Sequence, residues 1–562
     1  MSSESPQKPY KRKRKKTFLQ NARKYAKKGY YGRGSHMEAD TYQYFVRILE
    51  VFKQGFENDE DKAVFVDNVF EQTLEKEIEC SCNQVGCRVI EMLLPFASNS
   101  VLERFMSKFG EDLRPLCQDR FASFVIQALV KISCSKPQTY SHFAIKISKF
   151  LLNNLEDYAW DNFGNRIIRT CLCAFMNIPE DNKLLPETTE TISEEFTEIV
   201  KDYGERFIVW PQFSQLCTQE LTSGLLQVLL KAIKKADKKL LKKYLQKLLD
   251  ENFISTDDNN DALPPAFMST SLQMLLETSI QVAPKKLLKL YCQKLFEGRM
   301  LKLSTMKTSN FAVQKLLNQC TDKEQFEALF DELMDNFQDI IKQGHPGVLL
   351  AICQNCKRLS ARQGPFIQSL IKSLNCSESE QQFIMSVSRL TPYNPSNAIS
   401  NENLAKDKLN LQGTLMLQQM LEFNKPIKIV NSLLNMDLMD LKNLFSNSMG
   451  SHIVDSYVTS PFVGEKSREK LTRKMKGTYQ ELAASKYGSR SFEAIFNAAN
   501  MKTKTHIMEE LAYRDGSWAN TDHGRIIAAK INLALYKRDK ESWKNSFNKV
   551  VKPEEVMADV LK

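Results

Sequence analysis

The 562-residue chain lacks the uninterrupted apolar stretch that a membrane-spanning helix requires, and no apolar run follows a charged start as in a secretory signal. Its 13 cysteines stand at irregular spacings. Cys353 and Cys356 make one CxxC pair, but no second pair or histidine cluster stands at zinc-finger spacing. We therefore expect a soluble protein of a reducing intracellular compartment, with structural thiols, no metal, no other cofactor and no membrane partner.

Signatures of catalysis are missing as well. We find no Gly-rich loop ending in Lys, no HExxH, no nucleophile elbow and no Cys–His pair in a catalytic context. The six histidines are scattered: His36, His142, His345, His452, His506 and His523. The sequence therefore predicts a protein that is not an enzyme.

Positive charge is concentrated at the N-terminus. The net charge is +11, and residues 1–33 alone hold 12 Lys and Arg against a single acid, Glu4. The remaining chain is thus neutral, so an anionic partner would require a body whose charges are segregated onto different surfaces. We expect residues 1–36 to form a disordered basic tail for nuclear or nucleolar targeting or loose nucleic-acid attachment, with a solvated arm of no specific role as the alternative.

Beyond the tail the hydrophobic pattern is helical. Phe45, Ile48, Leu49 and Phe52 follow helix spacing after Tyr42, and few stretches alternate apolar and polar residues as strands do. We expect this first helix to cap the structure that follows. The fold class is all-α.

A six-residue helical pattern recurs eleven times. It consists of a small residue, two variable residues, two aliphatic residues and a third variable residue, although several copies are weak. The copies begin at residues 86, 122, 164, 222, 269, 309, 345, 413, 450, 488 and 524. A recurrence of this kind predicts stacked supersecondary units, which form one extended solenoid instead of separate globular cores.

The variable residues lie opposite the apolar stripe of their helix. In the second copy, Ala122, Val125 and Ile126 share one face, whereas the variable residues Ser123, Phe124 and Gln127 lie on the other. A phenylalanine in that place, like Phe311 in another copy, has to meet a neighbouring repeat or a ligand such as a nucleobase. Ser123 and Gln127 are four residues apart, which suits the edge of one base.

These residues at these offsets resemble the second helix of the Pumilio repeat, whose family mode is one single-stranded RNA base per repeat. The resemblance implies a uracil pair in Asn310 with Gln314, an adenine pair in Ser123 with Gln127, a guanine pair in Ser489 with Glu493, and a weaker relative of the guanine pair in Cys87 with Glu91. It implies base stacking by four side chains, Arg88, Phe124, Phe311 and Arg490.

Other copies depart from the family pattern, as in Asn165 with Arg169 or Ser451 with Asp455, and we expect them to contact backbone or shape, or nothing. His452 occupies a stacking position in its copy. The candidate RNA-binding residues are Cys87, Arg88, Glu91, Ser123, Phe124, Gln127, Asn165, Arg166, Arg169, Ser223, Gln227, Asn310, Phe311, Gln314, Ser451, His452, Asp455, Ser489, Arg490 and Glu493.

Eleven repeats behind a lysine-rich N-terminus are similar to the nucleolar protein 9 family; messenger-binding Pumilio proteins have eight. The resemblance implies a curved, C- or U-shaped α-solenoid superhelix that acts as a monomer in the nucleolus. It implies binding of precursor ribosomal RNA, a role in small (40S) subunit biogenesis and 18S rRNA maturation, and shielding of a processing site from premature cleavage. Assembly proteins of the pre-ribosome are possible further partners.

Interruptions of the helical period set the expected boundaries. N-terminal repeats occupy 37–390, with an acidic insertion near 177–195; a linker or insertion covers 391–410; and C-terminal repeats occupy 411–552. Lysines from Lys231 to Lys243 recur every three or four residues, which fits either a solvated helix face or a phosphate track.

Two other functions stay open. One is a cytoplasmic Pumilio-type regulator of messenger RNA, and the other is a protein-binding scaffold of the HEAT or armadillo kind. Protein-binding solenoids have no reason to place Asn-Phe with Gln, Ser-Phe with Gln and Ser-Arg with Glu at the same three offsets. The degenerate pairs favour an assembly factor over a messenger regulator, because fewer intact readers give less sequence selectivity.

Overall fold

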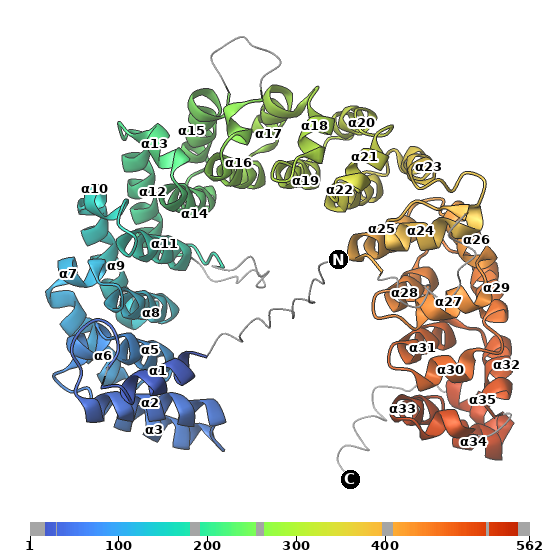
Figure 1. Ribbon diagram of the computed structural model, residues 1–562, viewed down its shortest axis with the longest axis horizontal. Coiled ribbons are helices and arrows are strands. Elements are labelled where there is room, and N and C mark those ends of the chain that lie inside the picture. The colour runs from blue at the N-terminus through green and yellow to red at the C-terminus, as the bar shows by residue number, and fades with distance from the viewer. Residues whose placement is uncertain are drawn as a thin grey trace, which may run out of the picture. The chain divides into compact units, whose positions relative to one another are not determined.

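The computed structural model describes residues 17–29, 31–179, 192–254, 263–395, 409–512 and 516–548. These residues form helices joined by short connections, and β pairing among them is limited to an isolated bridge between Gly34 and Asn83. The all-α prediction is therefore confirmed. The chain divides into two compact units, Met1–Leu287 and Leu288–Lys562, which are described separately (Figure 1).

Each motif copy lies at or near the start of the middle helix of a three-helix repeat. The first helices are α4 (Glu77–Ser81), α7 (Leu113–Gln118), α10 (Leu155–Tyr158), α13 (Phe213–Thr218), η3 (Pro265–Phe267), α18 (Met300–Thr305), α21 (Phe337–Lys342), α24 (Phe383–Arg389), α27 (Leu438–Phe445), α30 (Tyr479–Ala484) and η8 (Gly516–Asn520). The second helices, which carry the motifs, are α5 (Gln84–Leu93), α8 (Ala122–Ser135), α11 (Gly164–Phe175), α14 (Glu220–Ala236), α16 (Thr270–Val282), α19 (Asn310–Gln319), α22 (Pro346–Arg358), α25 (Leu411–Leu421), α28 (Ser451–Thr459), α31 (Gly488–Ala498) and α33 (Asp522–Lys530).

The third helices complete the repeats. They are α6 (Asn99–Glu111), α9 (Pro137–Asn153), α12 (Glu194–Ile208), α15 (Lys238–Leu248), α17 (Lys285–Tyr291), α20 (Lys323–Asp331), α23 (Gln363–Ser373), α26 (Ile427–Asn435), α29 (Glu465–Lys474), α32 (Met501–Ala512) and α34 (Leu533–Arg538). The remaining elements are α1 (Phe18–Ala26), α2 (Ala39–Gln54), α3 (Asp59–Glu71), η1 (Leu94–Phe96), η2 (Leu249–Phe253), η4 (Cys292–Phe296), η5 (Glu380–Gln382) and α35 (Lys540–Asn548).

The second helices pack side by side within each unit. In the first unit α5, α8, α11, α14 and α16 follow one another in contact, and in the second α19, α22, α25, α28, α31 and α33 do so. We call these the first row and the second row. In each unit the row lies on one side, here called inner, and the third helices lie on the outer side (Figure 1). The aliphatic pairs of the motif are buried, as with Val125 and Ile126 or Ile453 and Val454.

The small residue that opens the motif packs on the helix before it. A Cβ atom on Gly450 would lie 2.0 Å from the backbone oxygen of Leu444, six residues earlier. In another repeat Thr222 stands at this position, and its hydroxyl donates to the carbonyl oxygen of Leu216, also six residues earlier, at 2.7 Å. The first and second helices of a repeat are thus joined by close backbone approach or by a hydrogen bond.

The capping helix predicted after Tyr42 is α2. Its residues Tyr42, Phe45, Ile48 and Leu49 are buried, and the helix packs against α5 at the end of the first row. The exposed end of the first repeat is therefore covered, as an end repeat of a solenoid requires.

The expectation of a disordered tail through residue 36 is corrected for its described part. Residues 17–29 include α1, which opens with a reciprocal capping box between Thr17 and Gln20 and packs on α2 through the buried Ala22 and an ion pair between Arg23 and Glu50. The lysine content of the segment concealed this amphipathic face. Residues 1–16 lie outside the described chain.

Residues 31–36 are also ordered, as a strap across the turn between α4 and α5. The buried side chain of Asn83 donates from Nδ2 to the carbonyl oxygens of Tyr31 at 3.2 Å and Ser35 at 2.9 Å. The amide of Gln84 donates to the carbonyl oxygen of Arg33 at 2.9 Å. One buried side chain therefore fixes a segment that sequence composition marks as unstructured.

The division between the two units falls within the predicted 37–390 segment. The 391–410 segment belongs to the second unit. The helix before it, α24, packs against the helix after it, α25. The described ends of the segment are hydrogen-bonded: the Tyr393 amide donates to Leu374 and the Asn410 amide to Ser388, both at 2.8 Å. Residues 396–408, and residues 180–191 of the acidic insertion, lie outside the described chain.

The close approach at Gly450 gives a stability prediction. Gly450→Ala forces the new methyl group against the Leu444 carbonyl, and we expect a loss of about 1 to 3 kcal/mol, the usual cost of overpacking. The matched control is Gly464→Ala, because a Cβ at Gly464 meets nothing within 4 Å. Urea unfolding followed by circular dichroism compares the two, and equal midpoints would contradict the packing role.

Candidate nucleic-acid interface

The first variable residue of most motifs is buried. Ser123 is 1% exposed, Asn165 0% and Asn310 2%. Cys87, Ser223 and Ser451 are buried as well, whereas Ser489 is half-exposed. We expected the first and third variable residues to face a base together. At these positions the first residue is instead buried.

Two of these residues, Cys87 and Ser223, are hydrogen-bonded to the next repeat. The Cys87 thiol donates to the carbonyl oxygen of Phe121, which precedes α8, at 3.0 Å. The Ser223 hydroxyl donates to the carbonyl oxygen of Ser271 in α16 at 2.9 Å. The spacing of residues along one helix carries no information about the neighbouring repeat that buries this position.

The second variable residue is the outward one. Phe311 is 55% exposed, and Arg88, Arg166, His452 and Arg490 are exposed, whereas Phe124 is half-buried. An exposed phenylalanine on α19 costs hydration free energy in the absence of a ligand. The prediction that Phe311 lies outside its helix's apolar core is confirmed.

The third variable residues of α14 and α19, Gln227 and Gln314, are half-exposed and held by hydrogen bonds. Gln314 Nε2 donates to Asn310 Oδ1 at 2.9 Å, and Asn310 Nδ2 donates to the carbonyl oxygens of Met306 at 3.0 Å and Lys307 at 2.8 Å. The Gln314 amide is therefore oriented by a side chain that is itself fixed. In the same way Gln227 Nε2 donates to Ser223 Oγ at 3.4 Å.

A contact that the motif does not reveal joins third variable residues to the next repeat. Gln127 Nε2 donates to the Ser123 carbonyl oxygen, and Gln127 Oε1 accepts from the Thr170 hydroxyl of α11, both at 3.1 Å. Thr170 directly follows the motif's third variable residue in its own helix. Polar residues at that offset are the sequence signal that was available and not used.

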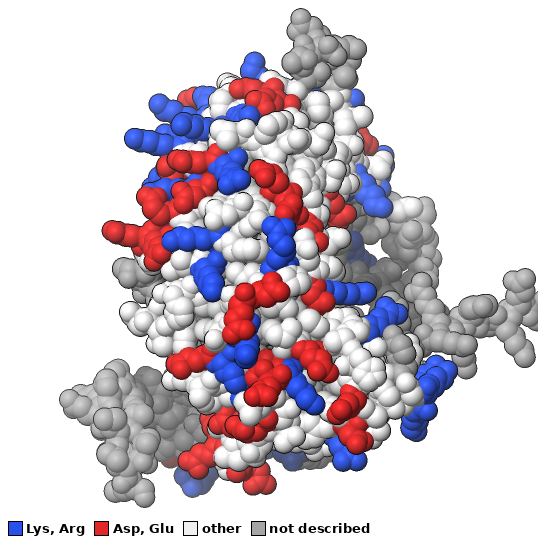
Figure 2. All heavy atoms as spheres, turned by 90° about the vertical axis from the view of Figure 1, so that its left-hand side faces the viewer, with Lys and Arg blue, Asp and Glu red and all other residues white. Residues whose placement is uncertain are grey.

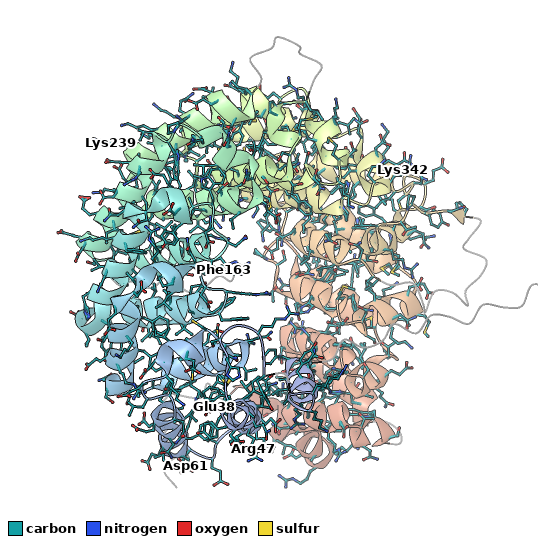
Figure 3. The ribbon with its side chains drawn as sticks, turned by 60° about the vertical axis from the view of Figure 1, so that its left-hand side comes forward. Glu38, Arg47, Asp61, Phe163, Lys239 and Lys342 are labelled. Atoms are coloured by element: carbon teal, nitrogen blue, oxygen red, sulfur yellow. The ribbon has the colours of Figure 1, made fainter. Side chains whose placement is uncertain are left out.

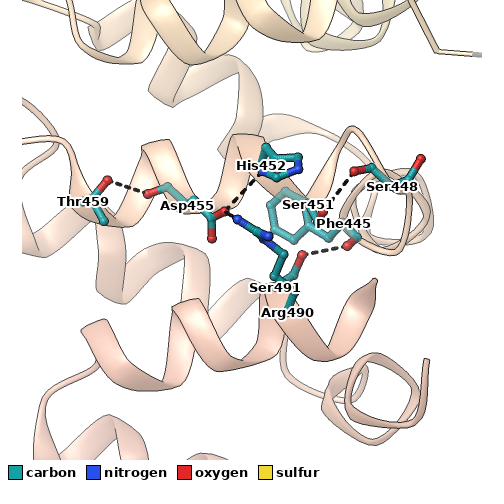
Figure 4. Close-up of polar contacts among 8 residues, drawn as sticks. All are labelled: Phe445, Ser448, Ser451, His452, Asp455, Thr459, Arg490 and Ser491. Atoms are coloured by element: carbon teal, nitrogen blue, oxygen red, sulfur yellow. Dashed lines mark hydrogen bonds and ion pairs between the residues drawn. The ribbon is translucent and has the colours of Figure 1, made fainter. Parts of the chain in front are cut away.

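Two third variable residues are carboxylates bound to cations of the following helix. Asp455 Oδ2 accepts from Arg490 Nε at 3.0 Å and Nη2 at 2.7 Å, and His452 Nδ1 lies 3.6 Å from the same oxygen (Figure 4). Glu493 accepts from Lys530 Nζ at 2.7 and 2.9 Å. The half-exposed Glu91 in α5 belongs to the same class of position.

On α7, α10 and α12, which are not part of the first row, basic side chains pair with acidic ones. Arg114 pairs with Asp157 at 3.0 Å and Arg206 with Glu156 at 3.4 Å. Basic and acidic side chains are intermixed over the face in Figure 2. Lys239 of the lysine-rich α15 lies on the outer side, whereas Phe163, which precedes α11, lies on the inner side (Figure 3).

Two other kinds of site are not found in the described residues. No group of three or more His, Cys, Asp or Glu there is placed to hold a metal ion. No helix in the same part of the chain has the length and apolar character needed to cross a membrane.

Comparisons with known proteins agree with this repeat structure. The model of a family described as NOP9-like PUF repeat domain matches residues 75–140 and 141–526. Nucleolar protein 9 of Homo sapiens is 22% identical, over 94% of this chain and 91% of its own length. Pumilio homolog 23 of Arabidopsis thaliana is 21% identical, over 91% of this chain and 73% of its own length.

A solved structure has the same fold. That of APUM23-GGAAUUGACGG matches with a TM-score of 0.72 and 21% identity, and the match covers 91% of this chain and 99% of that one.

The burial of Cys87 can be checked by its reactivity. Burial, followed by the charge of Glu91, raises the pKa of the Cys87 thiol to about 12. At pH 8, four units lower, only roughly one thiol in ten thousand is ionised, and the thiolate is the reactive form. We expect iodoacetamide to leave Cys87 unmodified in the folded chain and to alkylate it in urea, as read by peptide mass mapping. Equal alkylation in both states would contradict its burial against Phe121.

Proposed function

Because the chain belongs to the NOP9-like PUF repeat family, we propose that it is a nucleolar protein that binds single-stranded precursor ribosomal RNA along its rows of second helices. In this proposal it acts in small-subunit biogenesis and 18S rRNA maturation. The relatives named Nucleolar protein 9 support the nuclear and nucleolar location.

One observation carries the RNA-binding part of the proposal. In six of the eleven second helices, α5, α8, α11, α19, α28 and α31, the second variable residue is an at least partly exposed Arg, Phe or His, and the third variable residue is polar and half-exposed. Side chains suited to stacking and hydrogen bonding therefore recur within each row. The exposed Phe311 with the oriented amide of Gln314 is the clearest example. Aromatic and guanidinium planes take up unstacked bases, and amides bind their edges.

The repeats differ in how far their third variable residues must rearrange to bind a base. Around α19 the Gln314 amide is already fixed, so little ordering is needed on binding. Glu493 reads a base only by exchanging or sharing Lys530, and Asp455 likewise with Arg490. Exposed ion pairs contribute only about 0 to 1 kcal/mol, so a base that offers two donors can displace the cation.

Binding along the repeats would shield a processing site in the RNA from cleavage. An RNA strand held by several consecutive repeats has its phosphodiester bonds against a protein surface, where a nuclease cannot reach them without displacing the repeats one after another. Selectivity for a precursor RNA then comes from several moderate contacts together with the high local concentration of that RNA in the nucleolus.

Crosslinking the chain to RNA in cells and sequencing the attached fragments tests the target directly. We expect fragments of the ribosomal precursor around the 3′ end of the future small-subunit RNA. Enrichment of messenger 3′ regions would instead support a regulator of messenger RNA. If no RNA is crosslinked, the result would contradict RNA binding and support a protein-binding scaffold.

The α19 site is tested with Phe311→Ala combined with Gln314→Ala, which leaves the buried Asn310 in place. Removal of one stacked base costs about 1 to 3 kcal/mol, so we expect roughly 5- to 150-fold weaker binding and a relaxed preference at one RNA position. Filter binding with the probe GGAAUUGACGG and single-base variants of it measures both effects.

The matched control changes two exposed residues of the same repeat, Lys323→Ala with Glu324→Ala at the start of α20. This pair leaves the net charge unchanged and lies on the third helix. If both double variants bind RNA as the unchanged chain does, the base-reading role of α19 is wrong.

The basic N-terminus is tested by deleting residues 1–16, which removes seven Lys and Arg but leaves α1 intact. If these residues bind phosphates, the slope of log affinity against log salt becomes shallower by about 0.7 for each phosphate that the shortened chain no longer binds. A slope that stays the same would restrict this segment to targeting.

A further inference from the structure

Two arginines on α11 carry charge that nothing in the described chain neutralises. Arg166 is exposed and Arg169 half-exposed, and neither forms an ion pair or hydrogen bond with a described residue. The first variable residue of this motif, Asn165, is fully buried and donates its Nδ2 to the Ala159 carbonyl oxygen at 2.8 Å. The arginines are therefore the motif's remaining polar groups at the surface.

Their spacing makes the pair electrostatically unfavourable without a ligand. Residues three apart on a helix are neighbours, with about 5 to 6 Å between their Cβ atoms, and like charges at this spacing destabilise. In the second row the comparable cations are neutralised, Arg490 by Asp455 and Lys530 by Glu493. On α14, Glu220 is exposed at the helix start, but it is not paired with either arginine of α11.

The guanidinium group of Arg169 lies against the backbone of the next helix at Gly224. Gly224 is the second variable residue of α14, and a Cβ placed on it would lie 3.5 Å from Arg169 Nη1 and 3.8 Å from Cζ. The guanidinium thus lies beside bare backbone, where α31 instead presents the Arg490 side chain. A base beside α11 would have no side chain on α14 to stack upon, whereas a compact anion needs none.

We propose that Arg166 and Arg169 form a phosphate-binding site, in which the two guanidinium groups hold a backbone phosphate of single-stranded RNA at the junction with Gly224 of α14. This inference rests on the proposed function. Guanidinium groups bind phosphate oxygens bidentately, and such contacts are indifferent to base identity. At the α11–α14 junction the strand is therefore held by its backbone and not read by sequence.

The test measures affinity against salt concentration for the full chain, with GGAAUUGACGG and an 11-nucleotide oligouridylate as probes. For Arg166→Ala combined with Arg169→Ala we expect about tenfold weaker binding of both RNAs and a salt slope shallower by about 0.7, the value for one phosphate of a single strand. Gly224→Leu keeps both charges but places a bulky side chain against the Arg169 guanidinium, and we expect it to weaken the binding of both RNAs as well.

The matched control is Arg114→Ala combined with Arg206→Ala, which removes the same charge from α7 and α12, helices outside the first row. Thermal unfolding verifies that each variant is folded. Equal reductions of affinity in the control and the α11 variant would mean a general charge effect and overturn the site. Altered preference at one base with an unchanged slope would make the arginines base readers, also against the proposal. If the unchanged chain binds neither RNA, the proposed function itself fails, whereas normal RNA binding by both folded α11 and α14 variants removes only the phosphate site.

Discussion

The lateral contact between successive second helices is the constraint on which the rest of the structure depends. Each repeat is too small to bury its own apolar stripe, so the aliphatic pair of one motif is covered only when neighbouring helices pack against it. The small residue at the motif's start acts within the repeat, where it allows the second helix to approach the first helix closely. Once the helices are held together, outward residues recur at a spacing that no single repeat could define.

The same packing divides the three variable residues into different roles. The first is buried in most motifs: Cys87 and Ser223 bond to the following repeat, whereas Asn165 and Asn310 bond within their own. The second is outward, and the third reaches the following helix, where Gln127 meets Thr170 and Asp455 meets Arg490. The rows thus contain amides that are already oriented, carboxylates that hold a neighbouring cation, and, on α11, cations that no described residue neutralises. Affinity and selectivity along an RNA need not be distributed evenly over such repeats.

Much of the fold could be predicted from the chain alone, because the period of the motif and the burial of its aliphatic pair follow from helix geometry. All eleven copies lie at or near the start of a second helix. The site was predicted less well: Ser123 and Asn165 were expected to face a ligand and are buried, whereas Thr170 and Lys530 were not recognised. Composition misled at the N-terminus, where α1 and the strap held by Asn83 stand in a segment expected to be disordered.

The sequence by itself determined the all-α class, the number and register of the repeats, and which side of each second helix is apolar, since all of these depend on spacing along one chain. Only the tertiary structure decided which polar residues remain accessible, which are bound to the following repeat, and which arginines lack a counterion among the described residues. These properties depend on residues some 35 to 60 positions apart that meet when helices pack, as Arg490 meets Asp455 across 35 residues and Ser223 meets Ser271 across 48. A local pattern carries no information about such a partner.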